Sequence, residues 1–255
     1  MEVFLKFFKL SIFTVGIVYF ISMLLLYIFQ DRLLYITTPN CFSKQNGFYL
    51  PNSKSFVNSE NVDNKDAIIY FGGNAEGSEL TINEFKNSFK NYALYFLEYR
   101  GYGKSKGKPN QKDIIEDAIK LYDEVKKRHS KIYIIGRSLG SGVAQFVANK
   151  REVDKLILVT PYSSIEDVAK SRFPFFPVSL LLKDKYRVID LAHHLKAKEI
   201  LIILASNDEV IPKDVSKKLI YAIKRAKVIT LKDSNHNSIV YNSQYFKVIK
   251  DFIKE

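Results

Sequence analysis

The sequence contains a single cysteine, Cys41, in 255 residues, and this scarcity removes two common ways of stabilising a fold. One cysteine cannot form a disulfide within the chain, and it cannot supply the thiolates of a structural zinc site. Glycine and proline are also few, at 11 and 7 residues, while 47% of the residues are hydrophobic, which excludes collagen-like, low-complexity and disordered chains. The chain is therefore expected to fold around one packed core.

Acidic side chains are in deficit. The sequence has 39 lysines and arginines against 27 aspartates and glutamates, a net charge of +12. Such a balance favours anionic partners such as nucleic acid or acidic lipid head groups, but charge alone does not choose between them.

Residues 10–29 contain no charged side chain. Twenty helical residues at about 1.5 Å each cover the roughly 30 Å of bilayer hydrocarbon. The alternative is a cleaved signal peptide, but its apolar region is usually shorter, at roughly 7 to 15 residues, and no small-x-small cleavage site follows this one. We therefore expect an uncleaved signal anchor in residues 1–32, which spans the membrane over about 10–29.

The orientation of this anchor is harder to derive, because Lys6 and Lys9 precede the segment while Arg32 and Lys44 follow it. The two lysines lie in a short tail with no large domain behind them. We expect the amino terminus in the cytoplasm and the globular part on the non-cytoplasmic side. The positive charge of the globular part also allows the opposite orientation, in which this part would lie on anionic lipid at the cytoplasmic side of the membrane.

From residue 66 onward, short apolar runs alternate with segments of helical period, as in parallel strands joined by crossover helices. The clearest helix is predicted over residues 111–127, and another follows Pro212. The sequence thus predicts an α/β fold with a mostly parallel sheet and helices on both faces. The expected strands cover residues 67–71, 93–99, 131–135, 155–160, 199–205 and 227–231.

Two regions depart from this alternation. Residues 163–195 are too long for an ordinary connection and are expected to form a small inserted cap within an α/β domain over 66–255. Residues 33–65 give only a weak strand signal near 48–50, so a linker with a thin sheet edge is expected there. Three cap phenylalanines, Phe173, Phe175 and Phe176, are expected either to set acyl-chain preference or to pin the cap to the sheet or the membrane.

The motif Gly-x-Ser-x-Gly occurs at residues 136–140, directly after the predicted strand 131–135 and before small residues typical of a closely packed helix. This strand, tight turn and helix is the setting of a nucleophile elbow, which would expose Ser138. Serine is a poor nucleophile at neutral pH, so this interpretation needs a base, and the base needs an orienting acid.

Both partners follow in the chain order serine, acid, histidine, each after a predicted strand. Asp208 is the candidate acid and His236 the candidate base. His193 and His194 fit a solvated surface, and His129 fits the carbonyl end of a helix. Among the acids, Asp233 lies too close in sequence to His236, and Glu209 is a less suitable neighbour of Asp208.

An acyl-transfer serine also needs donors for the developing oxyanion. One is expected to be the backbone N–H of Leu139, and the other that of Asn74, with Ala75 as the alternative, in the glycine turn 72–77. Neither G-x-G-x-x-G nor G-x-x-x-x-G-K-[ST] is present, so this turn does not indicate a nucleotide site. The glycine turn that begins at Arg100 is expected to bend the backbone beneath the site.

Together these motifs resemble the α/β-hydrolase superfamily, and within it the membrane-anchored serine hydrolases related to abhydrolase-domain proteins. The resemblance covers about residues 66–255 and depends on an ordered set of segments: 71–77, 99–105, 136–140, 161–164, 208–212 and 236–237. Two departures stand out. Gly72 replaces the histidine of the family's first loop, and the region before residue 66 is shorter than the family's usual pair of antiparallel strands, so the first sheet edge is expected to be partly missing.

The resemblance implies a hydrolase of carboxylic esters or thioesters that forms an acyl-enzyme on Ser138, with no metal or organic cofactor. Its expected partners are the lipid bilayer and a small-molecule or acylated substrate, and not nucleic acid. The sequence leaves the oligomeric state open. A non-catalytic scaffold and a peptidase of the same fold remain as alternatives.

Overall fold

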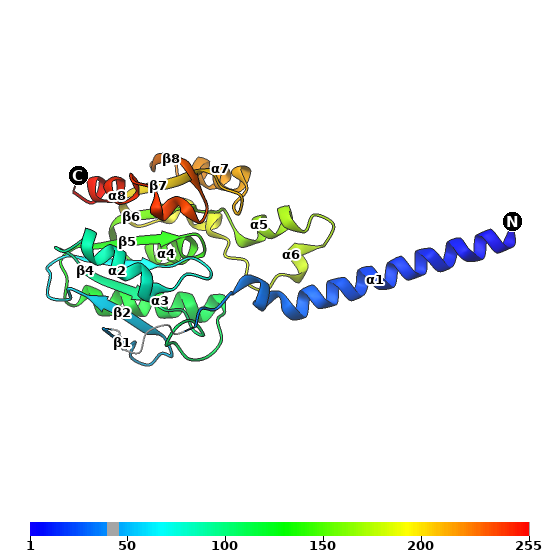
Figure 1. The fold of residues 1–255 in the computed structure, drawn as a ribbon, viewed down its shortest axis with the longest axis horizontal. Coiled ribbons are helices and arrows are strands. Elements are labelled where there is room, and N and C mark those ends of the chain that lie inside the picture. The colour runs from blue at the N-terminus through cyan, green and yellow to red at the C-terminus, as the bar shows by residue number, and fades with distance from the viewer. Residues whose placement is uncertain (40–45, 255) are drawn as a thin grey trace.

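In the computed structural model, which describes residues 1–39 and 46–254, a long helix precedes an α/β domain (Figure 1). The helices are α1 (Glu2–Leu34), α2 (Ser78–Ser88), α3 (Gln111–Lys126), α4 (Leu139–Lys150), α5 (Ile165–Arg172), α6 (Val178–Leu181), α7 (Lys213–Ala222) and α8 (Tyr245–Lys254). Two 3-10 helices are η1 (Val188–His194) and η2 (Ser238–Tyr241). The strands are β1 (Gly47–Tyr49), β2 (Phe56–Glu60), β3 (Ala67–Phe71), β4 (Ala93–Leu97), β5 (Ile132–Arg137), β6 (Val153–Val159), β7 (Ala197–Asn207) and β8 (Lys227–Asn235).

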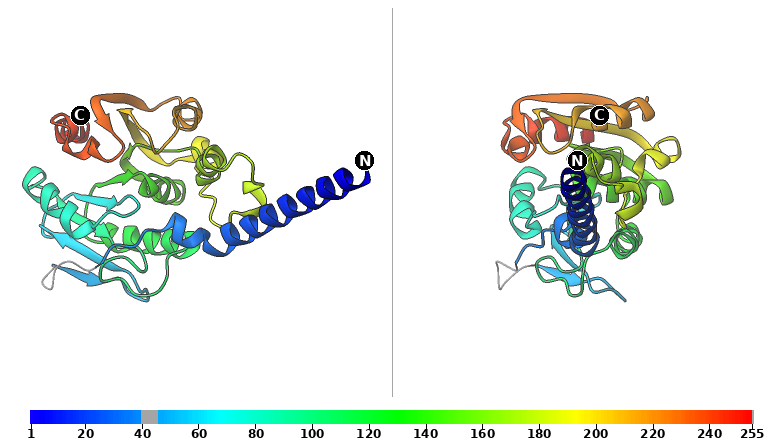
Figure 2. Two further views of the ribbon diagram at one scale, coloured as in Figure 1. Left: turned by 45° about the vertical axis from the view of Figure 1, so that its right-hand side comes forward. Right: turned by 90° about the vertical axis from the view of Figure 1, so that its right-hand side faces the viewer.

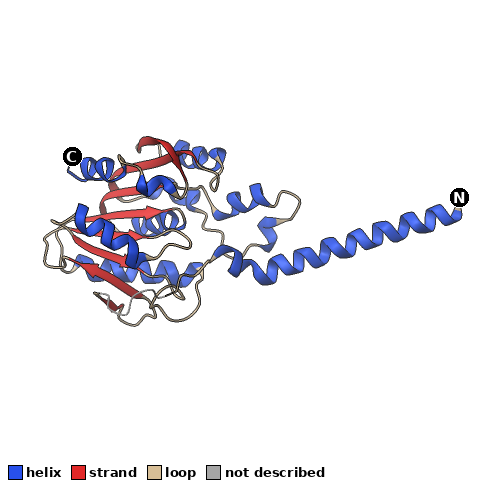
Figure 3. Ribbon diagram, in the orientation of Figure 1, coloured by secondary structure: helices blue, strands red, loops and turns tan. Residues whose placement is uncertain are grey.

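The eight strands form one sheet in the order β1-β2-β4-β3-β5-β6-β7-β8. The pairs β1–β2 and β2–β4 are antiparallel, and every other pair is parallel. All side chains of β3, β4 and β5 are buried, because helices cover both faces of the sheet (Figure 3). This is the α/β-hydrolase fold that the sequence predicts.

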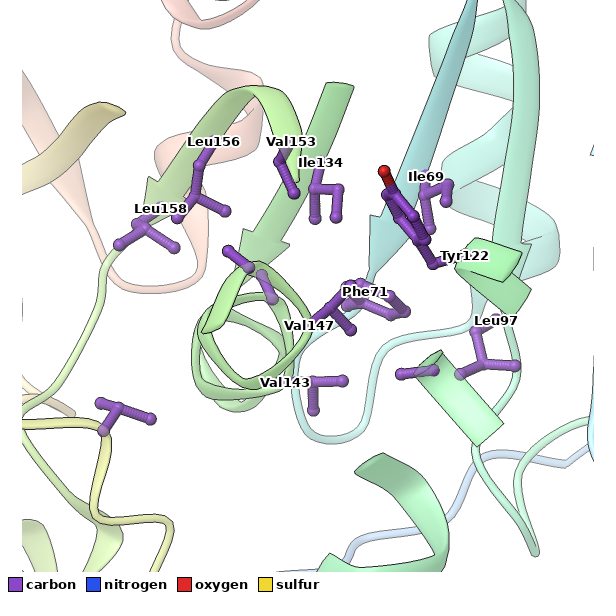
Figure 4. Packing of buried hydrophobic residues seen from close by; sticks show 14 of the residues in the cluster. Ile69, Phe71, Leu97, Tyr122, Ile134, Val143, Val147, Val153, Leu156 and Leu158 are labelled. Carbon is purple, nitrogen blue, oxygen red and sulfur yellow. The ribbon is translucent and has the colours of Figure 1, made fainter. Parts of the chain in front are cut away.

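The core has two layers, one on each face of the sheet. On one face, Val143 and Val147 of α4 pack beside residues of β3, β5 and β6 (Figure 4). On the other face, Phe85 of α2 and Phe252 of α8 belong to a second apolar cluster. The sheet is thus held from both sides, and its carboxyl edge provides a fixed platform for side chains.

The expectation of a partly missing sheet edge is wrong, because β1 and β2 form the antiparallel pair that the sequence analysis considered too short to fit. The reason lies in the composition of β2. It buries the polar side chain of Asn58, whose Nδ2 donates hydrogen bonds to Ser78 Oγ at 3.1 Å and to Glu98 Oε1 at 2.8 Å. These partners satisfy the amino group of the amide, although its Oδ1 has no hydrogen-bond partner in the described residues, and the strand forms without an apolar pattern.

Helix α1 is longer than the predicted span and projects from the domain, as the left view of Figure 2 shows. It is the one helix in the described residues that is long and apolar enough to cross a membrane. At its end, Tyr35 is buried, and its hydroxyl donates to Asp184 Oδ2 at 2.7 Å. The helix therefore enters the domain directly, next to the cap region that contains α5, α6 and η1.

Candidate active site

Ser138 occupies a strained turn between β5 and α4. Its φ of 49° and ψ of −118° are a conformation that residues with a side chain rarely adopt. Two glycines allow the turn to be this tight. A Cβ on Gly136 would lie 2.3 Å from the carbonyl oxygen of Gly140, and a Cβ on Gly140 would lie 2.0 Å from that of Phe71. The Gly-x-Ser-x-Gly motif thus forms the predicted elbow, with the serine at its apex.

The structure brings Ser138, His236 and Asp208 into one hydrogen-bonded chain. Ser138 Oγ lies 2.8 Å from His236 Nε2, and His236 Nδ1 lies 2.9 Å from Asp208 Oδ2 and 3.0 Å from Oδ1. A carboxylate can only accept hydrogen bonds, so Nδ1 carries the proton, which leaves Nε2 as an acceptor for the serine hydroxyl. This is the geometry that a nucleophile, a base and an orienting acid require.

Asp208 is held in its ionised form. Burial raises the pKa of its carboxyl, but hydrogen bonds from His236 and from the backbone N–H groups of Ile211 and Val210 outweigh burial, so the pKa lies below its ordinary value. The backbone bonds are 2.8 Å and 2.9 Å long and fix the carboxylate within its own loop. At neutral pH the imidazole therefore faces a full negative charge.

Two backbone donors are free to face an oxyanion. Leu139 is the first residue of α4, where an N–H has no intrahelical acceptor, and Asn74 N–H makes no hydrogen bond to the described residues. The Ala75 N–H, by contrast, donates to the carbonyl oxygen of Ile36 and to Asn74 Oδ1, both at 3.2 Å. The side chain of Asn74 is itself held by the hydroxyl of Tyr102 at 2.8 Å. The geometry thus favours Asn74 over Ala75 as the second donor.

A buried ion pair that the sequence analysis missed ties three parts of this site together. Arg137, the residue before the serine, donates from Nη1 to Glu76 Oε2 at 2.8 Å and from Nη2 to the carbonyl oxygen of His236 at 3.1 Å. Glu76 Oε2 also accepts the backbone N–H of Gly73 at 2.6 Å. The pair therefore connects the elbow, the histidine loop and the donor loop. Its only sequence signals are an arginine within the elbow motif and a glutamate near the glycine turn.

The other candidates have structural roles. His129 is buried, with Nε2 at 2.9 Å from the hydroxyl of Tyr95 and Nδ1 at 2.8 Å from the carbonyl oxygen of Asn64. It follows the carboxyl end of α3, as expected, but its ring bonds to Tyr95 and Asn64 and not to the last carbonyl groups of that helix. His193 and His194 are exposed on η1, as expected.

The glycine turn after β4 also behaves as expected. Gly101 and Gly103 have φ values of 82° and 50°, which glycine adopts at little cost. The side chain of Arg100 pairs with Asp113 and, at 2.8 Å, with the buried Asp117, neither of which belongs to the candidate site.

Comparison with known proteins finds relatives with this fold. Residues 64–182 match the profile of a family described as serine aminopeptidase, S33. Protein bem46 of Schizosaccharomyces pombe is 26% identical over 212 residues, which cover 78% of this chain and 71% of that protein. The lysophosphatidylserine lipase ABHD12 of Rattus norvegicus is 33% identical over 180 residues, which cover 62% of this chain and 45% of the lipase. The match therefore spans less than half of that lipase.

Solved structures agree at the level of the fold. Est1E from Butyrivibrio proteoclasticus, with ferulic acid bound, has a TM-score of 0.67 at 18% identity and covers 82% of this chain and all of its own. The Pyrococcus furiosus esterase Pf2001 has a TM-score of 0.65 at 16% identity, over 86% of this chain and 97% of its own. The chain therefore has the α/β-hydrolase fold, and its sequence is similar to that of an abhydrolase-domain protein.

The ion pair leads to a first prediction, for the variant Glu76→Gln. A glutamine keeps the size of the side chain but leaves Arg137 without its counter-charge and loosens the donor loop. We expect kcat for a chromogenic ester to fall by roughly ten- to a hundredfold with little change in KM, because a small misplacement of the donors affects the transition state most.

The matched control is Glu116→Gln, which removes the same charge from an exposed position of α3, away from the ion pair. Steady-state kinetics and thermal melting of both variants separate the two roles of the pair. A Glu76→Gln protein that melts earlier but keeps the wild-type kcat would restrict the pair to a structural role.

Proposed function

We propose that this protein is a membrane-anchored serine hydrolase that cleaves a carboxylic ester or thioester through an acyl-enzyme on Ser138. The observation that carries the proposal is the unbroken hydrogen-bonded chain from Asp208 through His236 to Ser138 Oγ. The names of its relatives support ester chemistry, since ABHD12 is a lysophosphatidylserine lipase and Pf2001 an esterase.

The reaction follows from the positions of the atoms. Ser138 Oγ attacks the carbonyl carbon of the substrate while its proton passes to His236 Nε2, and the resulting imidazolium is stabilised by Asp208. The carbonyl oxygen, now negative, accepts hydrogen bonds from the backbone N–H groups of Leu139 and Asn74. As the tetrahedral intermediate collapses, the bond to the leaving alcohol or thiol breaks, and the leaving group takes the proton from Nε2.

Water completes the cycle. His236 Nε2 removes a proton from a water molecule, whose oxygen attacks the acyl carbon on Ser138. A second tetrahedral intermediate forms on the same two N–H donors and then expels Ser138 Oγ, which regains its proton from the imidazolium. The products are a carboxylic acid and the free enzyme, with every proton returned to its starting atom.

Helix α1 supports the membrane part of the proposal. Its side chains over residues 10–29 are largely exposed, and a helix this apolar is stable in lipid and not in water. We place the globular domain on the non-cytoplasmic side, because the short tail carries Lys6 and Lys9.

A second candidate activity, peptide hydrolysis, is favoured by the description of the matching family as serine aminopeptidases. The same serine chemistry cleaves amides, so the substrate and not the mechanism separates the two candidates. Hydrolysis of aminoacyl anilides with no turnover of esters would select the peptidase.

The nucleophile can be tested by covalent labelling. The full-length protein in detergent should react with a fluorophosphonate probe, and Ser138→Ala should abolish this labelling because the variant lacks the attacking oxygen. Ser141→Ala is the matched control: its hydroxyl donates to the carbonyl oxygen of Ser138 at 2.6 Å and takes no part in the attack, so this variant should still be labelled. A wild-type protein that stays unlabelled would favour the non-catalytic scaffold.

The acid can be tested with Asp208→Asn. An amide in this position donates a hydrogen bond to the imidazole and favours the wrong tautomer, so turnover should fall by about 10⁴-fold. Ester hydrolysis under saturating substrate measures this loss, and circular dichroism checks that the fold persists. Turnover within tenfold of wild type would assign the orienting role to another acid.

The side of the membrane can be read from epitopes at the two ends of the chain. An epitope after residue 255 should bind antibody on intact cells, whereas an epitope before Met1 should bind only after permeabilisation. The reverse pattern would place the domain in the cytoplasm, where its positive charge faces anionic lipid.

A further inference from the structure

An apolar pocket of about 210 Å³ lies between the end of α1 and the cap. Leu26 and Leu33 of α1 form one wall, while Val168 and Ala169 of α5 and Phe176 of the cap form the opposite side. Among the residues that line it, only Gln30 and Arg172 carry polar side chains. A peptide or sugar in such a place would lose hydrogen bonds to water without replacing them, whereas a hydrocarbon chain loses none.

The polar groups of Gln30 are already used by the protein. Its side chain is 8% exposed, its Nε2 donates to the carbonyl oxygen of Leu181 at 3.1 Å, and its Oε1 accepts the N–H of Lys183 at 2.7 Å. These bonds attach α1 to the segment after α6 and hold the two walls of the pocket together. The pocket therefore offers hydrocarbon contacts and no free partner from Gln30.

The cap also runs along the part of α1 predicted to lie in the membrane. Tyr19, near the middle of residues 10–29, donates its hydroxyl to the carbonyl oxygen of Phe175 at 2.7 Å and stacks on Phe176 with ring centroids 5.3 Å apart. Tyr19 precedes Gln30 by eleven residues, about 16 Å along a helix. The tip of the cap is thus at membrane depth when α1 spans a bilayer.

The exposed side chains of the cap fit that depth. Phe175 and Leu180 are each 84% exposed, a surface that is unfavourable in water and favourable in lipid. The pocket lies between this apolar tip and α1, so an acyl chain can enter it from the surrounding leaflet without crossing water.

One residue that lines the pocket, Arg172, also contacts the loop of the candidate acid. Arg172 Nη2 donates to the carbonyl oxygens of Glu209 at 2.7 Å and Val210 at 3.3 Å, in the loop that holds Asp208. Helix α5 begins shortly after β6, whose residue Val159 accepts the N–H of Ser138 at 2.9 Å. Ser138, Asp208 and His236 do not themselves line the pocket, so it suits the distal part of a chain and not the bond that is cleaved.

We propose that this pocket holds one acyl chain of a membrane lipid substrate, and that the anchor helix α1 is itself a wall of the acyl-binding site. This inference rests on the proposed ester hydrolase activity. It assigns α1 a second task besides attachment, since the same helix selects substrate from the leaflet beside it.

The pocket is tested by filling it. Ala169→Phe in the full-length protein places a ring where the chain would lie, and we expect the ratio of kcat/KM for a 16-carbon over a 4-carbon ester to fall at least tenfold. Leu180→Phe, an exposed cap position outside the pocket lining, is the matched control and should keep the wild-type ratio. An Ala169→Phe protein with an unchanged ratio would overturn the acyl site.

Bilayer contact is tested without catalysis, because the sequence has no tryptophan and a single one gives a unique signal. Phe176→Trp and the control Tyr221→Trp, on α7, are each reconstituted in phosphatidylcholine vesicles with or without bromine atoms on the acyl chains. Bromine should quench the emission of Phe176→Trp by at least half and leave that of Tyr221→Trp unchanged. Equal emission from Phe176→Trp in both vesicles would show that no lipid chain reaches the pocket.

The outcomes separate this inference from the proposed function. Quenching depends on where lipid lies and not on Ser138, so it can be measured in the Ser138→Ala background. If Ala169→Phe is still labelled by fluorophosphonate but its chain-length ratio is unchanged, the hydrolase activity is supported and only the acyl-binding role of the pocket is refuted. An unlabelled wild-type protein would refute the hydrolase on which the inference rests.

Discussion

The close approach of α4 to the strands beneath it is the constraint on which the candidate site depends. Gly140 contacts the backbone of Phe71 at a distance that no side chain would permit, and Gly136 allows the first turn of the helix to close over β5. The same contact has three results. It gives Ser138 its strained conformation, places the first N–H of α4 directly after this serine, and brings the helix beside the end of β3. The loop after β3 contains the second N–H donor that we propose for the oxyanion.

Electrostatics then fixes what packing has brought together. Arg137 and Glu76 are both largely buried, and each is unfavourable in such a place without the other. Their hydrogen bonds reach backbone atoms of His236 and Gly73, so the charge pair joins loops from separate strands. Asp208 has a comparable role on the other side of His236, where backbone N–H groups compensate its charge. The donor loop, the histidine loop and the acid loop are therefore each held by a charged side chain.

The sequence predicted those features that local chemistry determines. The central strands are buried on both faces, so they appear in the sequence as continuous apolar runs. Ser138, Asp208 and His236 were predictable because each follows a strand whose end lies at the carboxyl edge of the sheet. β2 was missed because it buries Asn58, and β8 extends to Asn235 through polar residues that suit an exposed edge strand. The pair of Arg137 and Glu76 and the packing of α1 on the cap join residues far apart in sequence, and no periodicity in one segment reports such contacts.

The way in which α1 joins the domain limits how far the enzyme can reach. Leu34 ends the helix, and Tyr35, the next residue, is already buried and bonded to Asp184, so no flexible linker separates the apolar helix from the α/β domain. A tethered enzyme with a flexible linker would sweep over a wide area and sample molecules dissolved above the membrane. In the proposed membrane-anchored enzyme the helix would set the height and tilt of the domain. A lipid substrate would then arrive by lateral diffusion within a single leaflet, and its rate of capture would depend on the fluidity of that leaflet.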